Sequence, residues 1–216
     1  MSLKPQDICV LLKIVTLERS PWSYGQLAYE LGMSASEVHA GIKRATEASL
    51  MRLEEGWGVP DPEALEELLV HGVKYVFTPV HGRLTRGMPT SHAAPPLNRA
   101  FPGLDEPPPV WPDAQSDVRG YEFSPLYKSV PYAARRDARL YELLALVDGI
   151  RGGAETVREL ATRELQARLG TQTANGNALG LSRSKGQGTN AAASEFARGG
   201  HGEESRRVYR RRHRDT

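Results

Sequence analysis

The sequence predicts an α+β fold, and three observations support this prediction. Apolar residues recur at helical spacing over residues 5–48 and again over residues 130–169. Between these regions lie short β-like runs, and nine of the 15 prolines fall between Pro79 and Pro112, which excludes a continuous helix there. Residues 171–216 carry few large apolar side chains and should be disordered. We therefore expect one domain over residues 1–70, a smaller α+β region with C-terminal helices over residues 71–170, and a tail over residues 171–216.

The charges are unevenly distributed along the 216 residues. Residues 1–170 hold 19 Lys and Arg against 22 Asp and Glu, whereas residues 171–216 hold nine against four. The basic character therefore belongs to the tail, which is either an accessory contact to nucleic acid or an end without a function of its own.

The cysteine count and the hydropathy pattern indicate where the protein acts. A single cysteine, Cys9, excludes an internal disulfide, and its place among apolar residues favours a buried side chain. No uncharged apolar run approaches the ~20 residues that a membrane helix needs. We expect a cytoplasmic protein that does not bind membranes.

The first two helices are predicted from apolar spacing and from residues that end or cap helices. Residues 5–18 begin with a proline in the first turn, and Ser20-Pro21 ends the helix. Ser23 is placed to cap a second helix from about Tyr24 to Leu31. Gly32, which tolerates a left-handed conformation, ends that helix and allows a tight turn.

A third helix is expected to follow at once. Ser34 and Glu37 have the spacing of a capping box, which marks the N-terminus of this helix. The inward-facing residues have helical spacing and are Val38, Ile42 and Ala45. The residues that this spacing leaves on the outer face are Ser36, His39, Ala40, Lys43 and Arg44. Residues 50–60 then predict a β-hairpin with its turn at residues 54–56.

The pattern Leu27-Ala28-x-x-Leu31-Gly32-x-Ser34-x-x-x-Val38-x-x-x-Ile42-Lys43-Arg44 resembles the winged helix-turn-helix domains of bacterial transcription regulators, including the MarR-like group. The resemblance covers residues 5–60, and Ser49 stands where these domains usually have glycine. It implies a DNA-binding transcription regulator whose recognition helix, residues 34–48, enters the major groove of double-stranded DNA. The DNA-binding residues that it implies are Ser34, Ser36, His39, Lys43, Arg44 and Arg52.

An alternative function follows from the charges of this region. Residues 1–58 hold six basic and seven acidic side chains, and Glu54 and Glu55 at the tip of the hairpin would repel a DNA backbone. The alternative is a protein-binding module, such as an antitoxin-like or operon-partner protein. DNA binding would then be autoregulatory or absent.

The second half predicts further elements with less specific signals. We expect a helix over residues 61–71, a strand at Val73–Val80, a strand at Val118–Phe123, and helices at Pro131–Ile150 and 154–169. Residues 83–96 contain two arginines, and we expect a structural loop, with an anion site as the alternative. The last helix either pairs with its mate in a homodimer or packs on its own domain.

No motif for catalysis is present in the sequence. Gly-rich phosphate loops, zinc-protease motifs and nucleophile elbows are absent, and His81 and His92 have no third ligand nearby. We expect no enzymatic activity, no cofactor and no bound metal.

Overall fold

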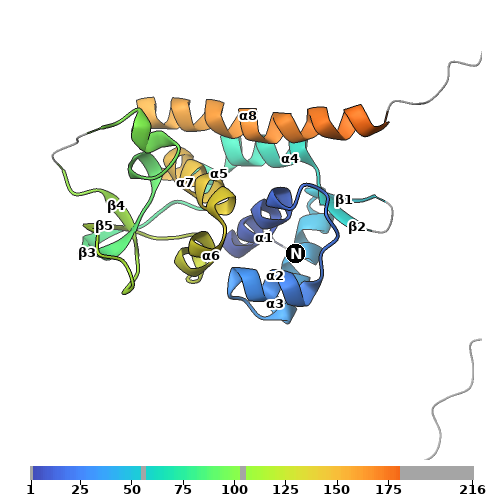
Figure 1. The fold of residues 1–216 in the computed structure, drawn as a ribbon, viewed down its shortest axis with the longest axis horizontal. Coiled ribbons are helices and arrows are strands. Elements are labelled where there is room, and N and C mark those ends of the chain that lie inside the picture. Colours follow the sequence, from blue (N-terminus) through green and yellow to red (C-terminus); the bar gives the residue numbers. More distant parts are fainter. Residues whose placement is uncertain (1, 55–56, 103–105, 181–216) are drawn as a thin grey trace, which may run out of the picture. The chain divides into compact units, whose positions relative to one another are not determined.

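The computed structural model describes residues 2–54, 57–102 and 106–180, which have a mixed helix and strand content as predicted (Figure 1). These residues belong to one compact unit. The expected boundary near residue 70 therefore does not separate two compact units. The physical reason is that Leu65 and Leu69, at the end of the expected first domain, are fully buried in the same hydrophobic core as Leu140 and Leu165 from the second.

The first 60 residues contain α1 (Pro5–Thr16), α2 (Tyr24–Leu31) and α3 (Ala35–Glu47), followed by the antiparallel strands β1 (Met51–Glu54) and β2 (Trp57–Pro60). The predicted caps are confirmed. The Ser23 side chain accepts a hydrogen bond from the Gln26 amide, and Gly32 ends α2 in the left-handed conformation at φ 63°. The tip of the hairpin, Glu55 and Gly56, lies outside the described residues.

The chain after the hairpin stays helical for longer than predicted. The helix α4 (Pro62–Glu67) continues through a π-helical turn (Leu68–Gly72) into α5 (Val73–Val76). The expected strand at Val73–Val80 is therefore wrong over its first half. The reason is that Leu65, Leu69 and Val73 recur every four residues and are all fully buried, so helical burial outweighs the strand preference of the β-branched residues.

Three strands form a small closed sheet. The long strand β3 (His81–Pro89) pairs antiparallel with both β4 (Pro109–Pro112) and β5 (Arg119–Phe123), and β4 pairs with β5 in parallel. The strand predicted at Val118–Phe123 is confirmed as β5. Residues Arg83–Pro89, which were expected in a loop, belong to β3. Glycine permits this tight closure, since a Cβ added at Gly87 would lie 2.2 Å from the Trp111 carbonyl oxygen.

The predicted helix Pro131–Ile150 is two helices, α6 (Val130–Arg136) and α7 (Ala138–Gly152). The break lies at Asp137, whose Oδ1 accepts hydrogen bonds from the Arg139 and Leu140 amides and so caps α7. Its Oδ2 accepts hydrogen bonds from Lys13 Nζ at 2.7 Å and from the Thr16 hydroxyl at 2.9 Å. This carboxylate therefore joins α7 to α1.

The last helix, α8 (Glu155–Gly180), confirms the prediction for residues 154–169 and continues ten residues into the expected tail. Its apolar side chains are buried within the same chain and are Val157, Ala161, Leu165 and Leu169. Within residues 155–169 the apolar stripe is thus used for packing on its own domain. The rest of the expected basic tail, residues 181–216, lies outside the described residues.

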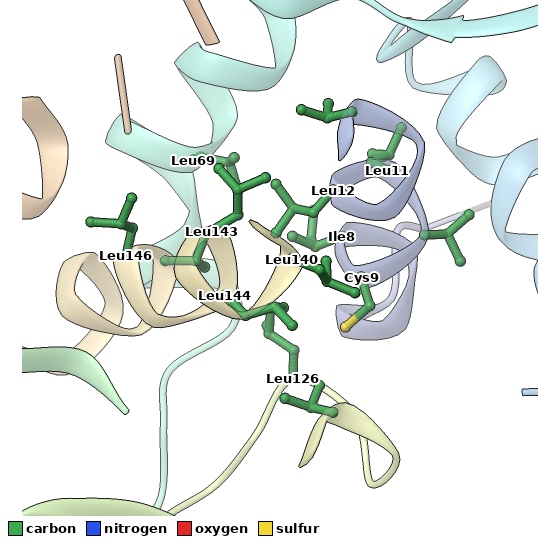
Figure 2. Close-up of a cluster of buried hydrophobic side chains, with 14 of the residues drawn as sticks. Ile8, Cys9, Leu11, Leu12, Leu69, Leu126, Leu140, Leu143, Leu144 and Leu146 are labelled. Carbon is green, nitrogen blue, oxygen red and sulfur yellow. The ribbon is translucent and has the colours of Figure 1, made fainter. Parts of the chain in front are cut away.

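The centre of the core lies between α1 and α7. Figure 2 shows Ile8, Cys9 and Leu12 of α1 beside leucines of α7. Cys9 is 1% exposed, which confirms that it is a buried side chain. Among the described residues, no helix combines the length and the apolar character needed to cross a membrane.

Candidate nucleic-acid interface

The helix α3 begins with the predicted capping box. The Ser34 hydroxyl accepts a hydrogen bond from the Glu37 amide at 3.2 Å, and Glu37 Oε2 accepts one from the Ser34 amide at 2.9 Å. The Ser34 hydroxyl also donates to Glu37 Oε2 at 2.9 Å. Ser34 is exposed, but its hydroxyl is engaged in fixing the start of the helix. Its first role is therefore structural.

Arg44 lies on the inner side of α3, which corrects the prediction that it is free on the outer face. Only 7% of Arg44 is exposed, and its guanidinium donates to Asp7 of α1 through Nε at 2.7 Å and Nη2 at 2.6 Å. Asp7 is fully buried and needs a cationic partner. The hydrogen bonds to Asp7 raise the pKa of Arg44. Arg44 is therefore occupied within the protein.

Gly41 makes the contact between Asp7 and Arg44 possible. A Cβ at position 41 would lie 3.0 Å from Asp7 Oδ1, tighter than most real contacts. The glycine thus leaves room for the α1 carboxylate to reach α3. The sequence does not reveal this requirement for glycine, because Asp7 and Arg44 lie 37 positions apart.

The outer face of α3 carries the other predicted residues of the helix. Ser36, His39 and Lys43 are all exposed, and their spacing of three and four residues places them on one face. The His39 ring lies 5.3 Å from the ring of Tyr24 on α2, centroid to centroid. The helix thus presents one hydroxyl, one imidazole and one ammonium group, which can donate hydrogen bonds to base edges or phosphates.

Arg52 lies on β1 and is separate from the face of α3. About half of its side chain is exposed, and Nη1 lies 3.2 Å from Asp61 Oδ2. The other oxygen of Asp61 accepts a hydrogen bond from the Ala64 amide and caps α4. Arg52 is therefore the exposed cation of the hairpin among its described residues, held beside a carboxylate at its base.

Residues from the second half cover the turn between α2 and α3, which the sequence did not reveal. The Ser129 hydroxyl donates to the Leu31 carbonyl at 2.6 Å, and the Tyr132 hydroxyl donates to the Tyr29 carbonyl at 3.2 Å. A Cβ at Gly32 would lie 2.9 Å from the Tyr132 ring. The helix α6 therefore holds this turn from outside.

Glu37 receives a further hydrogen bond from this second half. The Tyr127 hydroxyl donates to Glu37 Oε1, and this bond, followed by those from Ser34, lowers the pKa of Glu37 to about 2. The same bond raises the pKa of Tyr127. Glu37 thus remains ionised at neutral pH and fixes the start of α3 to both halves of the chain.

No family model matches the chain, and no curated protein and no solved structure is significantly similar to it. Within the described parts of the chain, no group of three or more His, Cys, Asp or Glu side chains is arranged to hold a metal ion. The geometry of α1–β2 and the residues exposed there are therefore the basis for a functional proposal.

Proposed function

We propose that residues 5–60 form a winged helix-turn-helix domain that binds double-stranded DNA with α3 in the major groove, and that the protein is a transcription regulator. The observation that carries this proposal is the outer face of α3, where Ser36, His39 and Lys43 are exposed on a helix capped by Ser34 and Glu37. A short turn at Gly32 precedes α3, and an antiparallel hairpin follows it. This order of elements is that of winged helices.

The few exposed cations of this domain can neutralise few phosphates, so most of the expected affinity must come from base contacts. Lys43 is an exposed cation on the outer face of α3, and Arg52 is a second exposed cation on the hairpin. Each phosphate neutralised contributes about 0.9 to the slope of log affinity against log salt. One domain should therefore show a shallow slope, and a homodimer on a palindromic site would double the number of contacts.

The experiment is a gel shift with the DNA upstream of the protein's own gene. The double variant His39→Ala/Lys43→Ala should weaken the specific complex at least tenfold, because base contacts contribute about 1–3 kcal/mol each. Arg163→Ala, an exposed arginine of α8, removes a positive charge elsewhere and should leave the complex nearly unchanged. Equal binding by the double variant and the parent protein would contradict the assignment of α3.

Arg44 is unsuitable for this test. Its replacement leaves the fully buried Asp7 without its cation, so lost DNA binding would report damage to the fold. Variants on the outer face of α3 avoid this ambiguity, since Ser36, His39 and Lys43 are exposed.

A second candidate function, a protein-binding module, is favoured by apolar side chains at the end of α5. Tyr75, Val76 and Val80 are mostly exposed and lie within six residues of one another. Exposed apolar clusters mark protein contacts more often than isolated residues do. Co-expression with the product of the adjacent gene, followed by purification of the complex, tests this function, and Tyr75→Ser/Val76→Ser should then prevent the complex.

A further inference from the structure

The strands β3 and β5 carry an exposed face with an unusual composition, which we call the β3–β5 face. Leu84 lies directly opposite Tyr121 in the strand register, and Arg86 lies directly opposite Arg119. Alternate residues of a strand point to the same side, so these four side chains share one side of the sheet. All four are exposed, Leu84 to 46% and Tyr121 to 51%.

Arg86 and Arg119 face each other across the two strands. Within the described residues, neither Arg86 nor Arg119 has a carboxylate within 4.0 Å. Like charges directly opposite on neighbouring strands repel and lower stability. Two guanidinium groups at directly opposite strand positions provide several N–H donors to an anion between them. Guanidinium donors suit phosphate oxygens in particular.

Among the described residues, none of the nearby carboxylates forms an ion pair with Arg86 or Arg119. Asp113, which follows β4, forms an ion pair with Arg135 of α6. Glu122 alternates to the other side of β5, where its carboxylate lies against the backbone of Gly82. Asp117 is exposed two residues before Arg119 but lies more than 4.0 Å from the charged atoms of both arginines. The face is therefore positively charged next to an exposed aromatic ring.

The sheet that carries this face is anchored to the core. The Asp148 carboxylate of α7 accepts hydrogen bonds from Trp111 Nε1 at 2.6 Å and from the Thr90 hydroxyl at 2.8 Å. These bonds fix β4 and the end of β3 to the core. At Gly120 of β5, a Cβ would lie 2.0 Å from the Pro108 carbonyl oxygen, so the strands are in close contact. The exposed side chains thus stand on a fixed platform.

We propose that the β3–β5 face binds single-stranded nucleic acid. Arg86 and Arg119 would hold backbone phosphates, and a base would stack on Tyr121 beside Leu84. This pairing of cations with an exposed aromatic ring is how proteins bind single strands, because every base has a stacking face and every nucleotide a phosphate. A duplex offers no exposed stacking face to Tyr121, so the chemistry selects the single strand. The proposal goes beyond duplex binding by α3 and does not depend on it.

The test measures fluorescence anisotropy of a labelled oligothymidylate and an oligouridylate of about 15 nucleotides with the full chain. Every variant retains the basic residues 181–216, so comparisons between variants isolate the face. Arg86→Ala/Arg119→Ala should weaken binding at least tenfold and reduce the salt slope by about 1.4, for two phosphates at about 0.7 each. Arg163→Ala should change the affinity less than twofold.

Two variants at one position test the stacking contact. Tyr121→Ala should weaken binding by about 5- to 150-fold, whereas Tyr121→Phe, which keeps the ring, should stay within twofold of the parent protein. The α3 variant His39→Ala/Lys43→Ala should retain single-strand binding. Failure of the duplex assignment would therefore leave this result unchanged.

Three results would overturn the proposal. The first is an equal loss of affinity in Arg163→Ala and in the Arg86 and Arg119 variants, which would indicate nonspecific charge. The second is competition by an unlabelled duplex as effective as that by the single strand. The third is no oligonucleotide binding at low salt. If sedimentation then showed a dimer that Leu84→Ser/Tyr121→Ser dissociates, the face would be an interface between two copies of the chain.

Discussion

The Arg44 guanidinium is buried against the carboxylate of Asp7, and two hydrogen bonds of 2.7 Å and 2.6 Å join α3 to α1. We expect Arg44→Ala to lower the free energy of unfolding by about 3–5 kcal/mol, because the remaining carboxylate is buried without its partner. Urea unfolding followed by circular dichroism measures this loss.

Lys43→Ala is the matched control for Arg44→Ala. Lys43 is the preceding residue on the same helix but is exposed, so its removal should change stability by less than about 0.5 kcal/mol. If both variants unfolded at the same urea concentration, the buried ion pair would not hold α3 in place.

Ser49 adopts a left-handed backbone conformation, φ 59°, between α3 and β1. Glycine adopts this conformation without steric strain. Because this conformation costs a residue with a Cβ about 1–2 kcal/mol, part of which glycine loses again in unfolded-state entropy, Ser49→Gly should stabilise the protein by about 0.5–1 kcal/mol.

Ser49→Ala is the control for the glycine variant. It removes the hydroxyl and keeps the Cβ, so the strain should remain and stability should not increase. Thermal unfolding of both variants measures the difference. A gain with alanine as large as that with glycine would show that the hydroxyl, and not the backbone, is the source of the effect.

The elements that the sequence predicted correctly are those specified by local signals. The start of α3 depends on Ser34 and Glu37, three residues apart, and the end of α2 depends on Gly32. Such caps act within one turn of helix and can be recognised from neighbouring residues alone. The same holds for the hairpin of β1 and β2, whose strands are adjacent in sequence.

The errors concern residues whose state depends on distant partners. Helical spacing alone placed Arg44 on the outer face. Its buried partner, Asp7, lies 37 positions away and could not be recognised from neighbouring residues. Asp137 divides one expected helix into α6 and α7 because its carboxylate also binds Lys13 and Thr16 of α1. Of the candidate α3 residues, Ser36, His39 and Lys43 needed only helical spacing to be placed, and they are exposed as expected.

The hydrogen bond from Tyr127 to Glu37 should make stability depend on pH. Glu37 has a pKa of about 2 in the folded protein, against an ordinary value of 4.5. A lowered carboxyl pKa contributes stability that is present above pH 4.5 and is lost as the pH falls toward 2. Stability measured by urea unfolding should therefore decline through this range.

Tyr127→Phe tests this pH dependence. It removes the hydroxyl that lowers the pKa of Glu37 most, while the bonds from Ser34 remain. The variant should be less stable at pH 7 and should lose less stability between pH 4.5 and pH 2 than the parent protein. An NMR titration of the Glu37 carboxyl carbon should show a higher pKa. An unchanged titration would place the cause of the low pKa in the Ser34 contacts alone.

The opposed arginines of the β3–β5 face predict a conflict between stability and binding. Arg119→Glu places a carboxylate opposite Arg86, so repulsion becomes attraction across the strands. Because cross-strand charge pairs contribute about 0.2–1 kcal/mol, the variant should unfold at a slightly higher temperature, and the gain should shrink at high salt. The same change should abolish binding of the labelled oligothymidylate. Arg163→Glu, on α8, should alter both properties far less. A gain in stability together with a loss of binding is the result expected of a site that keeps two like charges together for an anionic ligand. A variant that became more stable and still bound the oligonucleotide would show that Arg119 and Arg86 do not contact its phosphates.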